Sequence, residues 1–176
     1  MQYTMRYRSP LGGILLAADG EGMTGLWFDG QKYFAKGLAS RHEERSLPVL
    51  EEAKRWLDSY FSGREPNHMP PLHPIGTAFQ TEVWGILSRI PYGRTVTYGA
   101  IAKELAQRRD VPRFSAQAVG GAVGRNELSL LIPCHRVVGG DGSLTGYAGG
   151  LEKKAALLRL EGVPLRGYAL ETAAGA

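Results

Sequence analysis

LLIPCHRVVGG, residues 130–140, contains the only cysteine of the chain. Cys134 follows a proline and precedes His135 and Arg136, and apolar residues flank this group on both sides. A free cysteine is often buried as a small hydrophobic residue. Nearby cationic or hydrogen-bonding groups, however, lower the pKa of a thiol from about 8.5 and make it a better nucleophile. Two interpretations are therefore open, a structural thiol and a reactive one, and the rest of the chain is needed to choose between them.

The adjacency of Cys134 and His135 is weak evidence for a catalytic pair. The segment 130–138 is apolar and β-branched, which is typical of a buried strand or turn. Neighbouring side chains on a strand point to opposite faces of the sheet. Coupling between the thiol and the imidazole would therefore need a turn or a bridging water.

The composition is that of an ordinary globular protein. Of 176 residues, 43% are hydrophobic and 22% are charged, which excludes a disordered chain. No run of about 18 apolar residues is present and no signal peptide is recognised, so no membrane association is expected. One cysteine cannot form an internal disulfide or a multi-cysteine zinc site, and the four histidines have no metal-ligand spacing. We expect a cytoplasmic protein without a metal or other cofactor.

The charge is distributed unevenly along the chain. Residues 1–75 contain nine basic and nine acidic side chains, a balance of zero, whereas residues 76–168 contain twelve basic and seven acidic ones, a balance of +5. Random surface variation is one explanation. The other is a polyanionic partner such as nucleic acid, bound by the half of the chain that contains the cysteine.

Residues 1–75 predict an N-terminal α/β domain. Two apolar runs within residues 12–28 are separated by DGEG, residues 19–22, a signature of a β-hairpin. Residues 49–63 then predict a helix that ends at a glycine. Its apolar face is expected to contain Leu50, Ala53, Leu57, Tyr60 and Phe61. Four prolines in the next thirteen residues predict an extended linker, so we place the domain boundary between residues 75 and 76.

Residues 76–168 predict a mostly helical second domain, followed by a tail, residues 169–176. Glycine-rich residues 139–150 are expected to form a loop. The second and third of the expected helices are short, joined by a turn and surrounded by arginines, and they resemble a helix-turn-helix. The helices are expected over residues 77–90, 95–107, 115–126 and 151–162.

The helix expected over residues 115–126 is rich in alanine and glycine. A tightly packed core helix is one explanation for these small residues. Glycine, however, costs up to roughly 1 kcal/mol in a helix interior. The alternative explanation is that something large, such as a DNA groove, approaches the backbone of this helix closely.

The segment IPCHRVV, residues 132–138, closely resembles the methylated-DNA–protein-cysteine methyltransferases when it is read together with Asn126 upstream and with TGYAGG and LEG downstream. These are the O6-alkylguanine-DNA alkyltransferases of direct DNA repair. The similarity extends over about residues 77–166, and residues 9–33 are similar to the family's N-terminal region. The resemblance implies an α/β protein: a small N-terminal ribonuclease-H-like α/β domain, followed by a mostly helical winged helix-turn-helix domain.

The resemblance also implies an activity. The alkyl group of O6-alkylguanine, and also of O4-alkylthymine, would be transferred irreversibly and stoichiometrically from double-stranded DNA to Cys134, with the damaged base flipped out of the duplex. His135 would act as a base through water, Glu161 would orient it, and Asn126 would shape the active-site turn. A thioether is not released by water, so each monomer would react once. The substrate-binding residues implied are Tyr98, Val137, Tyr147, Ala148, Gly149 and Lys154.

The resemblance further implies that the helix at residues 115–126 enters the minor groove of DNA. The family commonly has an arginine where this chain has Gln117, and that arginine replaces the flipped base in the stack. A glutamine supplies no cation, so we expect Arg113 or Arg125 to compensate. The loop at residues 106–114 is longer than usual, which leaves its DNA contacts unassigned. The DNA-binding residues implied are Arg113, Ser115, Gln117, Ala118, Arg125 and Arg136.

Two alternative functions stay open. A winged-helix protein that recognises lesions or operators without accepting alkyl groups would bind DNA in a salt-dependent way and leave Cys134 unmodified. A cysteine hydrolase would turn over, and it would normally place its nucleophile and its histidine far apart in sequence. The adjacent cysteine and histidine argue against a hydrolase, and we favour alkyl transfer.

Overall fold

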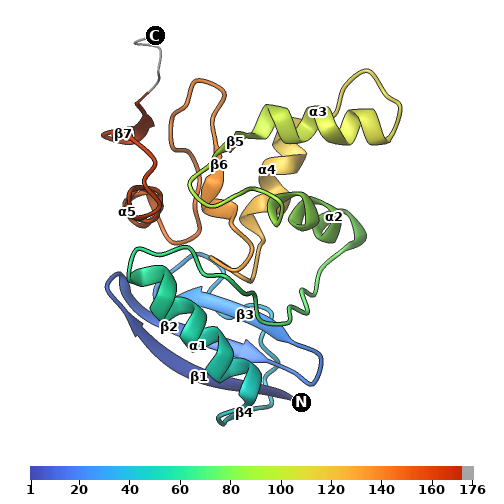
Figure 1. Ribbon diagram of the computed structural model, residues 1–176. Helices are drawn as coiled ribbons and strands as arrows, with labels where there is room; N and C mark the ends of the chain where they lie inside the picture. Colours follow the sequence, from blue (N-terminus) through green and yellow to red (C-terminus); the bar gives the residue numbers. More distant parts are fainter. Residues whose placement is uncertain (172–176) are drawn as a thin grey trace. The chain divides into compact units, whose positions relative to one another are not determined.

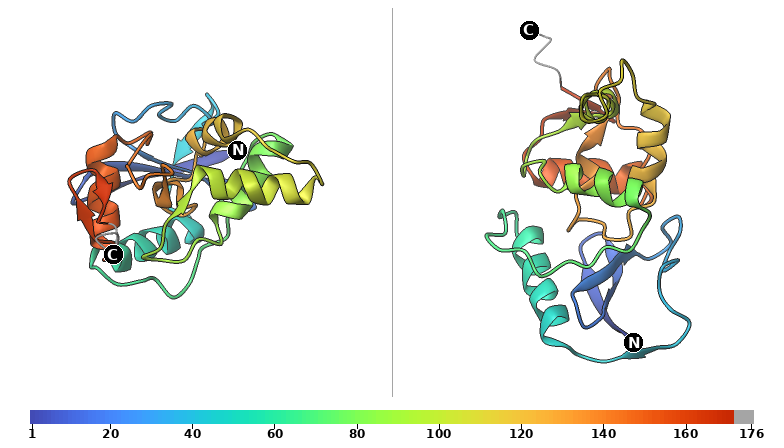
Figure 2. Two further views of the ribbon diagram at one scale, coloured as in Figure 1. Left: turned by 90° about the horizontal axis from the view of Figure 1, so that it is seen from above. Right: turned by 90° about the vertical axis from the view of Figure 1, so that its right-hand side faces the viewer.

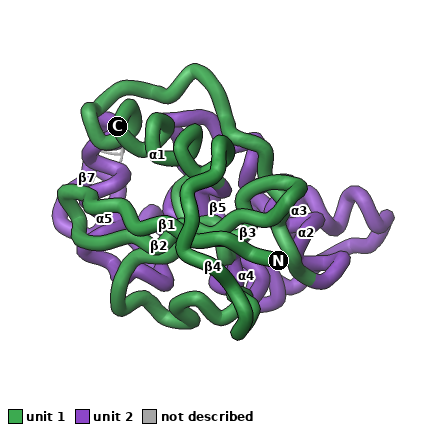
Figure 3. The backbone as a smooth tube through the Cα atoms, turned by 90° about the horizontal axis from the view of Figure 1, so that it is seen from below, with its two compact units in different colours: residues 1–76, 127–131 green, residues 77–126, 132–176 purple. Residues whose placement is uncertain are grey.

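The computed structural model describes residues 1–171 and divides them into two units. Unit 1 contains residues 1–76 and 127–131, and unit 2 contains residues 77–126 and the described chain from residue 132 onward (Figure 3). The first division lies one residue from the expected boundary. Residues 127–131 correct the expected domain limits, because they were placed in the second domain and belong to unit 1.

Unit 1 contains a four-stranded sheet with the strand order β3-β2-β1-β4 (Figure 1). β1 pairs with β2 and β2 with β3 in antiparallel fashion, and β4 is parallel to β1. The predicted hairpin is confirmed: the Asp19 carboxylate accepts hydrogen bonds from the backbone N–H groups of Glu21 and Gly22 and closes the turn. The strands are β1 (Gln2–Ser9), β2 (Gly12–Ala18), β3 (Met23–Phe28) and β4 (His42–Glu44).

The helix of unit 1, α1 (Pro48–Phe61), contacts β1 and β2. A proline at the first helical position is favoured because its missing N–H has no partner there in any case. The helix ends before Gly63, whose φ of 85° is a conformation that favours glycine. Phe61, which was expected on the apolar face, is only half-buried. The buried residues of the helix are Leu50, Ala53, Trp56, Leu57 and Tyr60.

The free edge of β3 binds a segment from much later in the chain. The Leu26 N–H donates to the Glu127 carbonyl over 2.8 Å, and the Ser129 N–H donates back to the Leu26 carbonyl over 3.2 Å. The indole N–H of Trp27 also donates to the Glu127 carboxylate. These bonds explain why residues 127–131 belong to unit 1.

Unit 2 is mostly helical, with two-residue strands between the helices. Residues 95–97 were expected to begin a helix, but two of them form β5, which pairs in parallel with β6. The tail also needs correction, because its residues 169–170 form β8 and pair with β7, while residues 172–176 lie outside the described chain. None of the helices within residues 1–171 has the length and apolar character needed to span a bilayer. The elements are α2 (Ala78–Leu87), β5 (Val96–Thr97), α3 (Tyr98–Arg108), α4 (Ala116–Gly124), η1 (Cys134–Arg136), β6 (Val137–Val138), α5 (Leu151–Leu160), β7 (Leu165–Arg166) and β8 (Ala169–Leu170).

The small residues of α4 have two different surroundings. One side of α4 packs against α2 and α3 (Figure 2), where the buried Trp84 indole N–H donates to the Ala122 carbonyl over 2.9 Å. On the other side, Gly121 and Gly124 are exposed, and a Cβ added at either would meet no atom within 4 Å. Packing therefore explains the small size of Ala122, but it does not explain these two glycines.

Candidate active site

Cys134 begins a single turn of 3-10 helix, η1, immediately after Pro133. Its backbone N–H donates to the Ile132 carbonyl over 2.8 Å, and the residue is only 6% exposed. His135 and Arg136, which complete the turn, are also buried. The sequence required a turn or a bridging water for any coupling between the side chains of residues 134 and 135, and a turn is present here instead of a strand.

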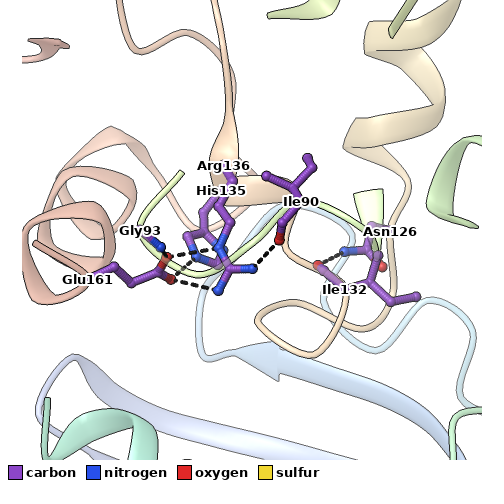
Figure 4. A network of polar contacts seen from close by, with 7 residues as sticks. All are labelled: Ile90, Gly93, Asn126, Ile132, His135, Arg136 and Glu161. Carbon is purple, nitrogen blue, oxygen red and sulfur yellow. Dashed lines mark hydrogen bonds and ion pairs between the residues drawn. The ribbon is translucent and has the colours of Figure 1, made fainter. Parts of the chain in front are cut away.

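Glu161, at the C-terminal end of α5, binds the residues of this turn and also the loop between α2 and β5 (Figure 4). Its Oε2 lies 2.6 Å from His135 Nε2, and its Oε1 accepts from Arg136 Nε over 2.8 Å. The same Oε1 accepts from the Gly93 N–H over 2.9 Å. The Arg136 guanidinium also donates to the Ile90 carbonyl over 2.7 Å. One fully buried carboxylate therefore fixes both the histidine and the arginine.

The charges in this network favour a neutral His135. Burial alone would raise the pKa of Glu161, but the hydrogen bonds and charges of His135 and Arg136 lower it to about 2. Burial lowers the pKa of His135, and this outweighs the opposing effect of Glu161. Because Arg136 already neutralises the carboxylate, we assign a neutral imidazole with its proton on Nε2, toward Glu161. That tautomer makes Nδ1 the basic nitrogen.

Asn126 contributes to the site in two ways. Its buried side-chain amide donates to the Ile132 carbonyl over 2.8 Å (Figure 4). This hydrogen bond connects the residues on either side of the segment 127–131. Burial raises the pKa of the Cys134 thiol, whereas a hydrogen bond from Asn126 and the charge of Lys154 act to lower it. The thiol is therefore protonated at rest, and its conversion to a thiolate requires a base.

Lys154 is a fully buried lysine on α5. Its ammonium donates to the carbonyls of Val137, Thr145 and Gly146 over 2.5, 2.9 and 3.1 Å. Burial lowers the pKa of Lys154 to about 8, and the Cys134 thiol acts in the opposite direction. Lys154 thus attaches the glycine-rich loop to β6 and places a positive charge near the thiol. The resemblance suggested a contact with the leaving base, whereas the bonds of the ammonium here are to backbone carbonyls.

We expect Lys154→Met to lower the free energy of unfolding by about 2–4 kcal/mol, because three carbonyls, including the buried one of Val137, lose a charged donor. It should also raise the pKa of Cys134, since the lysine charge opposes the effect of burial. Chemical denaturation measures the first effect, and the pH dependence of Cys134 alkylation by iodoacetamide measures the second. Lys153→Met, at the half-buried neighbouring position, is the control. An unchanged thiol pKa in Lys154→Met would contradict the electrostatic role.

Two tyrosines border the cysteine turn. The Tyr98 hydroxyl, at the start of α3, donates to the Thr145 carbonyl over 3.1 Å. The ring of Tyr147 meets the His135 ring edge-on, with the centroids 6.5 Å apart. Ala148 and Gly149 follow Tyr147 in the loop and are partly exposed, while Val137 is buried in β6. All of the residues expected to bind substrate therefore lie in unit 2.

Of the residues expected to bind DNA, five are exposed and one, Arg136, is buried. Ser115 caps α4 by accepting a hydrogen bond from the Ala118 N–H over 3.0 Å. Arg136 is a correction: it is 8% exposed and its guanidinium is bound to Glu161 and Ile90. We therefore remove Arg136 from the DNA interface. The members that are exposed are Arg113, Ser115, Gln117, Ala118 and Arg125.

Sequence reasoning missed the loop before β5 as part of the site. Gly93 has a φ of 75°, and a Cβ there would lie 3.1 Å from the Glu161 carbonyl oxygen. The PYG segment, residues 91–93, signals a turn. Nothing in it indicates that the Gly93 N–H would meet a carboxylate at residue 161.

In comparisons with known proteins, the two units match two domains of the same protein family. The family described as "6-O-methylguanine DNA methyltransferase, ribonuclease-like domain" matches residues 2–73, and "6-O-methylguanine DNA methyltransferase, DNA binding domain" matches residues 78–163. The methylated-DNA–protein-cysteine methyltransferase of Haemophilus influenzae is 43% identical over 163 residues, covering 92% of this chain and 87% of that protein. The corresponding protein of Methanosarcina acetivorans is 42% identical over 160 residues, covering 91% of this chain and 98% of that one.

Solved structures agree with the sequence comparisons. The crystal structure of Mycobacterium tuberculosis OGT in complex with DNA superposes with a TM-score of 0.75 and is 38% identical, with 91% of each chain covered. The expected two-domain α/β architecture and the expected family are thereby confirmed. The chain belongs to the 6-O-methylguanine DNA methyltransferase family.

Proposed function

We propose that this protein repairs DNA by transferring the alkyl group of O6-alkylguanine, and also of O4-alkylthymine, to Cys134. The observation that carries the proposal is the geometry around the lone cysteine. A buried thiol precedes a neutral histidine whose Nε2 is held by a carboxylate with a pKa of about 2. Such an arrangement provides a nucleophile and a base that is ready to accept its proton.

The transfer is a displacement at the alkyl carbon. The thiol proton passes to His135 Nδ1 through a water molecule, and Sγ then forms a bond to the alkyl carbon as the bond from that carbon to O6 breaks. The electron pair of the broken bond stays on the guanine, which takes up a proton and leaves as the ordinary base. Donors near the leaving base, such as the Tyr98 hydroxyl, stabilise its developing negative charge.

The reaction consumes the protein. A thioether is not cleaved by water, and the chain has no second cysteine that could take over the alkyl group. One protein molecule therefore repairs one lesion. We propose that the protein acts as a monomer, as the family resemblance implies, and that it works in a reducing compartment such as the cytosol, which suits a free thiol.

Duplex DNA would be bound by the exposed side of α4. The lesion lies inside the base stack, so the nucleotide has to be flipped out to reach a buried thiol, at a cost of a few kcal/mol. Gln117 lies in the first turn of α4 and is exposed, as expected for a side chain that fills the vacated space. The exposed glycines of α4, which packing does not explain, would allow its backbone to approach the minor groove.

This model predicts opposite effects of Gly121→Ala on stability and on DNA binding. Alanine is favoured over glycine inside a helix, so the free energy of unfolding should rise by about 0.5–1 kcal/mol. Duplex affinity should fall several-fold, because the new methyl group projects from the face that meets DNA. Gly85→Ala on α2 is the matched control, since a Cβ there would also meet no atom within 4 Å. Equal duplex affinity in the two variants would contradict binding by α4.

Intact mass spectrometry tests the proposed function. The protein is mixed with an excess of duplex carrying one O6-methylguanine, and unmodified duplex serves as the control. We expect a gain of one methylene per protein molecule, located at Cys134 by peptide mapping. An unchanged mass together with duplex binding would instead support the alternative, a winged-helix protein that binds lesions without accepting alkyl groups.

A further inference from the structure

The loop between α3 and α4, residues 109–115, has an ordered start (yellow in Figure 1). Asp110 has a φ of 52°; its N–H donates to the Gln107 carbonyl over 3.2 Å, and the Val111 N–H donates to the Ala106 carbonyl over 3.0 Å. These two bonds form a Schellman motif, the common C-terminal stop of a helix, with aspartate where glycine is usual. The long loop therefore has a defined conformation where it leaves α3.

Side-chain contacts with α2 hold the same loop. The Arg109 guanidinium carbon lies 4.9 Å from the centre of the Phe114 ring and 5.9 Å from that of Phe79. The two rings stack with their centroids 5.6 Å apart. Arg109 also donates to both carboxylate oxygens of Glu82, over 2.7 and 3.4 Å. An arginine held by two rings and a carboxylate keeps the loop in one position.

The loop and α3 border an open surface hollow of about 420 Å³. Lys103 and Gln107 of α3 line one side, and Val111 and Arg113 of the loop line another. Ala116, the first residue of α4, also lines it. The hollow is therefore continuous with the exposed side of α4 that we assign to DNA.

Basic side chains outnumber acidic ones around the hollow. Between residues 103 and 113 the chain has four basic side chains and two acidic ones, a balance of +2. Arg108 pairs with Glu104 over 2.6 Å, and Arg109 is bound to α2. Within residues 1–171, neither Lys103 nor Arg113 has an ion-pair partner, and both are exposed. The two cations that line the hollow are thus the ones left available to an outside anion.

We propose that this hollow is a seat for the DNA backbone, in which Lys103 and Arg113 each bind a phosphate beside the part of the duplex reached by α4. The inference rests on the proposed function and extends it, because it assigns the long loop to backbone contact. Lys103 belongs to α3 and Arg113 to a loop that Arg109 holds in place, so the backbone that bears each cation is already ordered and phosphate binding costs less entropy. The loop thereby supplies positive charge near α4, where Gln117 supplies none.

The salt dependence of duplex binding tests this proposal. The logarithm of the affinity falls linearly with the logarithm of the salt concentration, with a slope of about −0.9 for each phosphate neutralised. With unmodified duplex, Lys103→Ala and Arg113→Ala should each reduce the magnitude of the slope by about 1, and the double variant by about 2. Arg113→Lys should keep the wild-type slope, because it keeps the charge.

Arg108→Ala is the matched control, because it removes one exposed positive charge that pairs with Glu104 and does not line the hollow. It should leave the slope near the wild-type value. A wild-type slope in the double variant, or an equal loss in Arg108→Ala, would overturn the seat. Methyl uptake by the wild-type protein from a duplex carrying one O6-methylguanine is measured separately by intact mass. Its failure would count against the proposed function and leave the outcome for the hollow unaffected.

Discussion

Cys134→Ser is expected to abolish methyl uptake from a duplex carrying O6-methylguanine, a loss of about 10³-fold or more. A serine hydroxyl has nearly the size of the thiol but is a far weaker acid, so His135 cannot convert it to a useful nucleophile. A soft, polarisable sulfur is also the better partner for an alkyl carbon. The measurement is the intact mass of the protein after incubation with excess lesion-containing duplex.

Comparison of this variant with the wild type separates alkyl transfer from lesion binding without transfer, because only an alkyltransferase takes up methyl in the wild type and loses that uptake in the variant. If the protein is an alkyltransferase, Cys134→Ser should lose methyl uptake and keep its affinity for unmodified duplex, because the buried thiol does not lie on the exposed face of α4. Thermal unfolding of the variant verifies that the fold is retained. Methylation of Cys134→Ser at another residue would show that Cys134 is not the acceptor.

The parts of the fold that were predictable are the local ones. Asp19 and the glycines after it define a turn between two apolar runs, and the hairpin is present with that turn. Ser115 is a good helix cap, and α4 begins at the next residue. Residues 127–131 were not predictable, because their place depends on the free edge of a strand formed a hundred residues earlier.

In the candidate site too, local features were predictable from the sequence, whereas contacts between distant segments were not. The adjacent Cys134 and His135 are visible in the sequence, but the single 3-10 turn that contains both is not. The resemblance placed Arg136 among the DNA-binding residues. Its buried pairing with Glu161 depends on how α5 packs against η1. Lys154 was recognised as part of the site, whereas its bonds to three carbonyls required the folded loop.

Glu161→Gln is expected to lower both stability and activity. The carboxylate accepts hydrogen bonds from His135, Arg136 and the Gly93 N–H in a fully buried position. Its removal leaves the Arg136 cation buried beside a neutral amide, which costs about 3–5 kcal/mol. The rate of alkyl transfer should fall by about 10²-fold or more, because a misaligned His135 no longer accepts the thiol proton efficiently. The measurements are urea unfolding and single-turnover methyl transfer.

The loss of stability in Glu161→Gln should depend on pH in a specific direction. The pKa of Glu161 falls from 4.5 to about 2 on folding, so its contribution to stability, about 3 kcal/mol, is complete above pH 4.5. That contribution decreases as the pH falls toward 2, where a protonated Glu161 resembles glutamine. The difference between wild type and variant should therefore narrow below pH 4.5. Glu104→Gln is the control: Glu104 also binds two arginines, but it is partly exposed, so its loss should cost less than about 1 kcal/mol. Equal costs for the two variants would show that the burial of Glu161 does not strengthen its contribution to stability.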